Sequence, residues 1–149
     1  MFLHLAAILI LTVGSCSGNS VTDFEDCGSS VGEINNIDIT PCDHPSSRCR
    51  IPRGTNATLA VNFTANGLIT SAKTFIWGIV DDNMYPFPVP LDACEHMKCP
   101  LQSGSQAVYN NVFFLSAVLP PINATAKFEL VDQLDRRIIC FTVPVLLAW

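Results

Sequence analysis

The sequence predicts an all-β fold, an immunoglobulin-like β-sandwich of two antiparallel sheets, from three observations. Apolar and polar residues alternate with a period of two, which is typical of strands with one buried face, and no segment keeps the helical period of about 3.6 residues. Turn residues such as Asn66-Gly67 and Pro120-Pro121 divide the runs into about seven strands. Six of the seven cysteines follow an apolar leader, as in an exported domain stabilised by disulfides.

The leader has the features of a secretory signal peptide. Residues 5–13 are almost all apolar and residues 14–18 are small, although the usual Lys or Arg at the start is missing. The apolar stretch is shorter than the ~20 residues that a membrane-spanning helix needs. We therefore predict a signal peptide over residues 1–18, cleaved near Ser17 or Gly18. Cleavage removes Cys16 and leaves one domain, residues 19–149, with six cysteines.

The predicted strands follow one another along this domain. Alternation in residues 32–40 is broken, which indicates a β-bulge. In residues 58–65 the apolar side chains lie at odd positions, so Asn62 is expected to point outward. Residues 73–80 are almost continuously apolar, as in a strand buried on both faces. The remaining expected strands are residues 108–119, 124–131 (with Ala126, Phe128 and Leu130 inward) and 138–147.

A proline-rich segment lies between two of these strands. Pro86, Pro88 and Pro90 alternate with Phe87 and Val89. Because proline cannot donate a backbone hydrogen bond, the segment is expected at a sheet edge or in an extended loop that leaves it. It would hold Phe87 and Val89 stiffly at the rim of the sandwich. These two side chains either cap the core or line a pocket, since pockets and cores share one composition.

The net charge and the glycosylation sequons indicate which partners and which surface modifications to expect. The 13 acidic and 8 basic residues give a net charge of −5, which argues against nucleic acid and against adsorption to anionic lipid headgroups. Three sequons, at Asn56, Asn62 and Asn123, predict N-linked glycans on an exported surface.

Two motifs invite an enzymatic or metal interpretation. Gly28-Ser29-Ser30-Val31-Gly32 has the G-x-S-x-G pattern of hydrolases. That motif requires a helix directly after it, and no helical pattern follows here. Cys94, His96 and Cys99, with His44, could be drawn as zinc ligands, yet thiols in an oxidising compartment pair with each other and leave His96 as an exposed loop residue. We expect no enzyme, no metal and no cofactor.

The chain resembles the Niemann–Pick type C2 family, within the ML-domain lipid-recognition group. Residues 93–101 are also very similar to the group 2 mite allergens, which are arthropod members of that group. The resemblance covers essentially the whole mature chain and depends on the order and spacing of several motifs. These motifs are Asp26-Cys27-Gly28, Pro41-Cys42, Val61-Asn62-Phe63-Thr64, Pro86-Phe87-Pro88, Cys99-Pro100-Leu101 and Cys140-Phe141-Thr142-Val143-Pro144-Val145.

The resemblance implies an apolar cavity between the two sheets that accepts a sterol or another hydrophobic lipid. It implies the disulfide pairs Cys27–Cys140, Cys42–Cys49 and Cys94–Cys99. It also implies that five side chains bind the lipid, namely Phe87, Leu115, Leu119, Phe141 and Ile76. At Leu119 the family has a tyrosine and at Phe141 a tryptophan, so each position loses a polar group. Strict cholesterol specificity is therefore in doubt, and fatty acids or other apolar compounds remain as ligands.

The predicted function is that of a secreted lipid carrier, monomeric, which hides a lipid from water and releases it to a membrane or an acceptor protein. It would work outside cells or in the lysosomal lumen. The alternative is an immunoglobulin-like protein-interaction or innate-recognition module with a solid core and no transport role.

Overall fold

Nine strands and one short 3₁₀ turn make up residues 20–149, the part of the chain that the computed structural model describes. The predicted signal peptide, residues 1–18, lies outside this part. No helix among the described residues is long and apolar enough to cross a bilayer. The elements are β1 (Glu25–Asp26), β2 (Gly32–Thr40), β3 (Cys49–Pro52), β4 (Thr55–Ala65), β5 (Ala72–Val80), β6 (Asn83–Phe87), η1 (Ala93–Glu95), β7 (Gln106–Leu115), β8 (Ile122–Asp132) and β9 (Arg137–Ala148).

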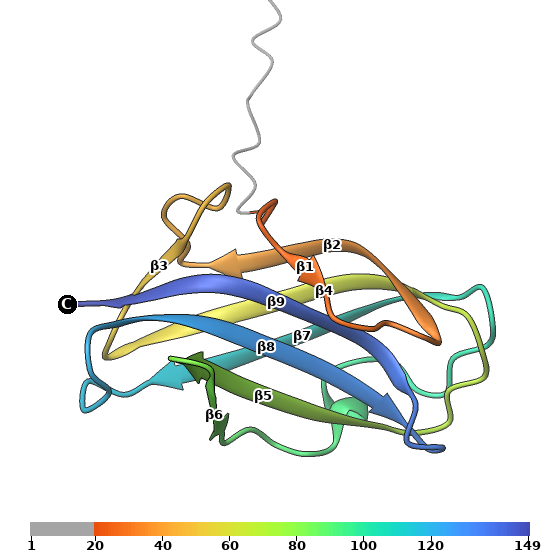
Figure 1. Ribbon diagram of the computed structural model, residues 1–149. Helices are drawn as coiled ribbons and strands as arrows, with labels where there is room; N and C mark the ends of the chain where they lie inside the picture. Colours follow the sequence, from red (N-terminus) through yellow and green to blue (C-terminus); the bar gives the residue numbers. More distant parts are fainter. Residues whose placement is uncertain (1–19) are drawn as a thin grey trace, which may run out of the picture.

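The strands form two facing sheets, which confirms the predicted sandwich (Figure 1). The larger sheet has the order β1-β9-β8-β5-β6, and the smaller one has the order β2-β4-β7. Neighbouring strands are antiparallel, except that β3 pairs with β9 in parallel. The short strands β1 and β3 were not predicted, and they raise the number of strands from about seven to nine.

Strand β9 accommodates a proline because of where its partners end. On one edge β9 pairs along its length with β8. On the other edge β1 pairs with Phe141 and Thr142, and β3 begins to pair at Val145. Pro144 lies between these two segments, where the second edge has no partner strand. A residue without an N–H is tolerated in such a break in the ladder.

Alternation places the core as the sequence predicts in β4 and β8. Val61 and Phe63 are fully buried while Asn62 between them is only half-buried on the outer face, and Phe128 and Leu130 are buried on β8. The expected irregularity in β2 is a register shift between Ile34 and Asn36.

Strand β5 differs from its prediction as a strand buried on both faces. Only Ala72 and Thr74 are buried, Lys73 is exposed, and the residues from Phe75 to Val80 are half-buried. The apolar run in the sequence therefore has another origin. No further layer of the described chain covers the outer face of this sheet, and from Ile76 onward the inner face of β5 borders a cavity rather than packed side chains.

Three disulfides join the pairs that the family resemblance implies. Cys27–Cys140 ties the segment after β1 to β9 across 113 residues, and Cys42–Cys49 closes the loop between β2 and β3. Cys94–Cys99 joins η1, which contains Cys94, to the segment that follows it. The long bridge removes the most conformational freedom from the unfolded chain and anchors both ends of the domain.

Candidate functional site

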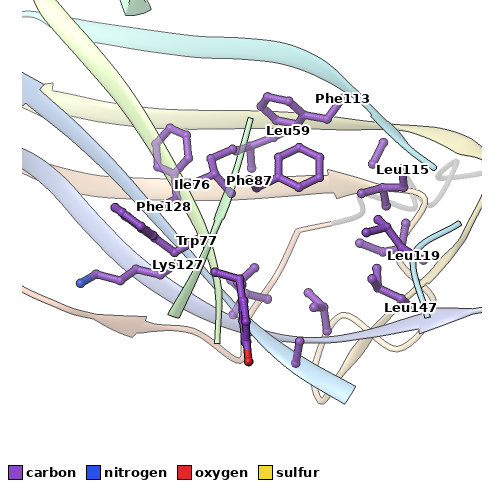
Figure 2. Close-up of a pocket in the computed structure, with 18 of the residues that line it drawn as sticks. Leu59, Ile76, Trp77, Phe87, Phe113, Leu115, Leu119, Lys127, Phe128 and Leu147 are labelled. Carbon is purple, nitrogen blue, oxygen red and sulfur yellow. The ribbon is translucent and has the colours of Figure 1, made fainter. Parts of the chain in front are cut away.

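An apolar cavity of about 570 Å³ lies between the sheets (Figure 2). It occupies only one half of the sandwich. In the other half, Val61 of β4, Tyr109 of β7 and Leu130 of β8 are fully buried and fill the space between the layers. The volume falls within the ~300–1,000 Å³ of typical ligand pockets. The lining comes from the inner faces of both sheets and from the segment that follows β7.

All five side chains that the sequence analysis assigns to lipid binding line this cavity. Ile76 lies on β5, Phe87 ends β6, Leu115 ends β7 and Phe141 lies on β9. Leu119 differs from its prediction because it is not part of a strand: β7 ends four residues earlier, at Leu115. The structure nevertheless brings Leu119 to the same cavity.

The mouth of the cavity lies between two edge strands. Strand β6 is one edge of the larger sheet and β7 is one edge of the smaller sheet, so no backbone ladder closes the sandwich there. Among the lining residues Tyr85, Pro86 and Pro120 are exposed, and they mark the opening. The proline-rich segment thus begins in an edge strand, β6, as predicted, and the last residue of that strand, Phe87, points into the cavity (Figure 2).

Two aromatic rings meet just inside this mouth. Phe87 and Phe113 contact each other edge to face, with ring centroids 6.2 Å apart and an angle of 89° between the rings. Figure 2 shows them side by side, with Leu115, Leu119 and Leu147 grouped further along the cavity. At the packed end Phe141 stacks on Phe128 with centroids 5.1 Å apart. Aromatic faces therefore bound the cavity at both ends.

The lining offers almost no polar chemistry. Only four lining residues have a polar side-chain atom at all: Thr58, Trp77, Tyr85 and Lys127. The Lys127 ammonium forms an ion pair with Glu129 at 3.0 Å, and in Figure 2 it points away from the labelled apolar side chains. The two carboxyl groups whose pKa is shifted, Asp26 and Asp132, are not part of the lining. Such a cavity suits an apolar ligand that is held by contact area.

A glycine enlarges the cavity. Gly78 lies two residues before the end of β5, on the face that it shares with Ile76, and no atom lies within 4 Å of the place where its Cβ would be. The space that a side chain would fill is therefore open. Glycine inside a strand often marks close approach of a ligand or another backbone, and that signal was present in the sequence.

Phe113 and Leu59 were also missed as lining residues. Strand parity could have found them, because Phe113 shares its face of β7 with Leu115, and Leu59 lies on the buried face of β4. Parity alone, however, does not distinguish Phe113 at the cavity from Tyr109 in the packed half of the same strand.

Arg53 positions the segment that carries Leu119. Its Nη1 donates hydrogen bonds to the carbonyl oxygens of Ala117 and Leu119, and its Nε donates one to Ala148 at 3.3 Å. The ring of Trp149 covers the guanidinium, which lies 4.4 Å from the ring centroid. A planar group with several fixed donors can join three backbone carbonyls in this way. Arg53 thereby fixes one side of the mouth although it is not a lining residue.

The two motifs that suggested other chemistry have structural roles. Ser30 precedes β2 rather than a helix, and its hydroxyl donates to the carbonyl of Arg137 at 2.7 Å. Cys94 and Cys99 bond to each other, and among residues 20–149 no group of His, Cys, Asp and Glu could hold a metal ion. The expected exposure of His96 is wrong: it is half-buried, and its ring packs against Tyr109 with centroids 5.9 Å apart.

The chain is similar to known proteins along nearly its whole length. The ML domain matches residues 21–147. The Canis lupus familiaris protein "NPC intracellular cholesterol transporter 2" is 31% identical over 147 residues, which is 97% of each chain. The crystal structure of a Niemann-Pick type C2 protein from the Japanese carpenter ant is 28% identical, with a TM-score of 0.78 over 83% of this chain and 98% of that one. Chicken MD-1, complexed with lipid IVa, has the same fold, with a TM-score of 0.54 and 11% identity over 85% of this chain and 88% of that one.

Proposed function

The chain belongs to the ML-domain family, and on this premise we propose that it is a secreted carrier that binds a sterol or another hydrophobic lipid and releases it unchanged. The observation that supports this most strongly is the cavity of about 570 Å³, which is almost entirely apolar and opens between two sheet edges. The similar dog protein is named as a cholesterol transporter. Phe87, Leu115, Leu119, Phe141 and Ile76 are proposed to contact the lipid.

The affinity expected from such a cavity is moderate. A sterol has about 28 heavy atoms, and at ~0.3 kcal/mol per atom its binding yields roughly 8 kcal/mol, or a micromolar Kd. Few polar groups in the lining could recognise a particular headgroup, so shape and apolar area set the preference. We propose a sterol as the reference ligand, with fatty acids and other slender apolar molecules as competitors.

A membrane is the proposed acceptor, because exposed apolar side chains stand beside the mouth. Met84 and Tyr85 on β6 are 46% and 57% exposed, and Val118, in the segment that Arg53 fixes, is 90% exposed. Their insertion into a bilayer would let the lipid pass between cavity and membrane without crossing water. The net charge of −5 favours neutral over anionic bilayers. The carrier is proposed to act as a glycosylated monomer, outside cells or in the lysosomal lumen.

A titration and a transfer assay test these two steps separately. Lipid-stripped protein is titrated with a fluorescent sterol, and saturation near one sterol per chain with a Kd of about 1 μM is expected. The loaded protein is then mixed with phosphatidylcholine vesicles, and Val118→Asp is expected to slow transfer without changing the Kd. Absence of saturable binding contradicts the carrier; unchanged transfer in Val118→Asp contradicts only the proposed docking at the mouth.

A further inference from the structure

The outer face of the edge strand β7 carries a row of three exposed apolar side chains, interrupted by the exposed Asn110. Val108, Val112 and Phe114 are 46%, 55% and 62% exposed, and alternation places all three on the face opposite to the cavity. Strand β7 is the edge of the sheet β2-β4-β7. An edge strand with apolar side chains tends to pair with other chains, and proteins usually protect such an edge. The loop after η1 contacts the backbone edge of β7 once, where the Asn110 N–H donates to the carbonyl of His96 at 3.0 Å, but no element among residues 20–149 covers the exposed side chains of the row.

The strand register puts two sequon asparagines beside the row. Asn56 of β4 pairs with Phe114, and Asn62 pairs with Val108. Residues that pair directly across an antiparallel ladder share a face, with Cβ atoms about 4.5–5.5 Å apart. Both asparagines belong to N-x-T triplets, completed by Thr58 and Thr64. The two ends of the apolar row therefore each have a glycan acceptor as their cross-strand neighbour.

The asparagine that faces the aromatic ring is also accessible. Asn56 is exposed, and within residues 20–149 its side-chain amide makes no hydrogen bond that a glycan would have to break. Phe114 is the most exposed of the three apolar residues in the row. The first sugar of an N-linked glycan is N-acetylglucosamine, whose ring presents C–H groups on its faces. The negative face of an aromatic ring attracts such weakly positive hydrogens.

We propose that the first N-acetylglucosamine linked to Asn56 packs on the ring of Phe114, and that the glycan so held covers the apolar edge strand β7. The sugar takes the place of the missing layer over this part of the sheet. At the other end of the row, Asn62 lies beside Val108, which has no aromatic face, so its glycan shields the strand with less contact. This inference concerns the outer surface and does not depend on what the cavity binds.

A double-mutant cycle between Asn56 and Phe114 tests the contact. The protein is secreted from a eukaryotic host, glycan occupancy is read by mass spectrometry of glycopeptides, and thermal unfolding is measured for wild type, Asn56→Gln, Phe114→Ala and the double variant. Phe114→Ala is expected to fold because the side chain is 62% exposed. Asn56→Gln is expected to lower the Tm by about 3 °C in the wild-type background and by much less in the Phe114→Ala background.

Two controls separate the contact from general effects of glycosylation. Asn123 lies on the other sheet, opposite Leu146 rather than an aromatic residue, so Asn123→Gln should shift the Tm equally in both backgrounds. Trimming the glycans enzymatically to one N-acetylglucosamine should preserve the coupling between Asn56 and Phe114, because the first sugar makes the contact. An unmodified Asn56, or equal Tm shifts for Asn56→Gln in both backgrounds, overturns the proposal.

Discussion

Phe87 and Phe113 belong to different sheets, yet their rings meet edge to face with centroids 6.2 Å apart. This contact spans the gap between the edge strands β6 and β7, at the mouth of the cavity. At this contact the two sheets touch each other beside the half of the sandwich that the cavity occupies. The contact is made by side chains alone and can open without breaking a β-ladder. A carrier needs such a contact if its ligand is to enter and leave.

Replacing Phe87 by Ala should weaken lipid binding more than it weakens the fold. The ring is half-exposed at the mouth, and a bound lipid would lose its contact area, which is worth about 1 to 3 kcal/mol. Replacing a phenylalanine of a solid core by alanine would instead lower the free energy of unfolding by about 3 to 5 kcal/mol. Fluorescent-sterol titration and chemical unfolding of the stripped protein measure the two quantities. If Phe87→Ala lowered the free energy of unfolding by more than it weakened the free energy of sterol binding, Phe87 would be a core residue.

Filling the cavity should separate binding from stability. Leu115→Phe puts a larger side chain into space that a ligand needs, and it is expected to raise the Kd by about tenfold. The stripped protein should tolerate the change, whereas overpacking of a solid core costs about 1 to 3 kcal/mol. Val112→Phe is the matched control, because Val112 lies on the same strand but faces outward. Equal sterol binding in both variants would contradict the assignment of Leu115 to the cavity.

Gly78→Val should have the same effect on binding from the opposite sheet. The new side chain has room, because nothing lies within 4 Å of its Cβ, and valine favours a strand more than glycine does. We therefore expect a Tm equal to or above that of wild type together with weaker sterol binding. A lower Tm for the stripped protein would mean that the space beside Gly78 is filled. Thermal unfolding and titration of the same preparation decide between these outcomes.

Arg53→Lys should loosen the mouth. One ammonium cannot join the carbonyls of Ala117, Leu119 and Ala148 as the guanidinium does, and hydrogen bonds to charged groups contribute about 1.5 to 3 kcal/mol each. We expect a lower Tm and faster release of bound sterol in stopped-flow measurements. Arg50→Lys is the control, since Arg50 makes an exposed ion pair with Asp43 at 3.9 Å. Identical release rates in the two variants would remove Arg53 from the account of the mouth.

The pKa of Asp132 determines part of how the stability of the fold changes at acid pH. Burial alone would raise the pKa of its carboxyl group, but hydrogen bonds from Leu134 and Arg136 and the charge of Arg136 outweigh burial and lower it. A group with a lowered pKa stabilises the fold above its ordinary pKa of about 3.9, and this stabilisation is lost as the pH falls through the folded-state value. Asp132 therefore contributes fully at pH 5 and at pH 7.

The measurement is the Tm of wild type and Asp132→Asn from pH 7 to pH 2. The variant should be less stable at neutral pH, because the amide cannot replace a carboxylate paired with Arg136, and the gap between the two curves should narrow below about pH 4. Parallel curves over the whole range would show that the Asp132 charge does not contribute to acid stability.

Features that depend on residues close together in the sequence were predictable, whereas features that depend on residues far apart were not. Period-two alternation is a local property and correctly placed the inward faces of β4 and β8. Alternating prolines correctly marked the edge strand that holds Phe87. The distance between the two sheets, in contrast, is not set by any local sequence pattern. Tyr109 and Phe113 lie on the same face of β7, yet one is fully buried and the other borders the cavity.

Leu119 and β5 show the same limit. The position of Leu119 depends on a hydrogen bond from Arg53, 66 residues away in the sequence, which no local pattern reports. The long apolar run of β5 predicted burial on both faces, but its inner residues from Ile76 onward border the cavity, and the residues from Phe75 to Val80 are only half-buried. In both cases, contacts between segments far apart in the sequence determine where the residues of the local pattern lie in the structure.

The most direct test of the carrier is to identify what the protein holds. Wild type and Leu115→Phe are purified from the medium of a eukaryotic host, extracted with organic solvent and analysed by quantitative mass spectrometry. The account predicts a sterol or another apolar lipid at close to one molecule per wild-type chain, and much less for Leu115→Phe. A wild-type protein that carries no lipid, and that takes none up when stripped and offered sterol, would contradict it.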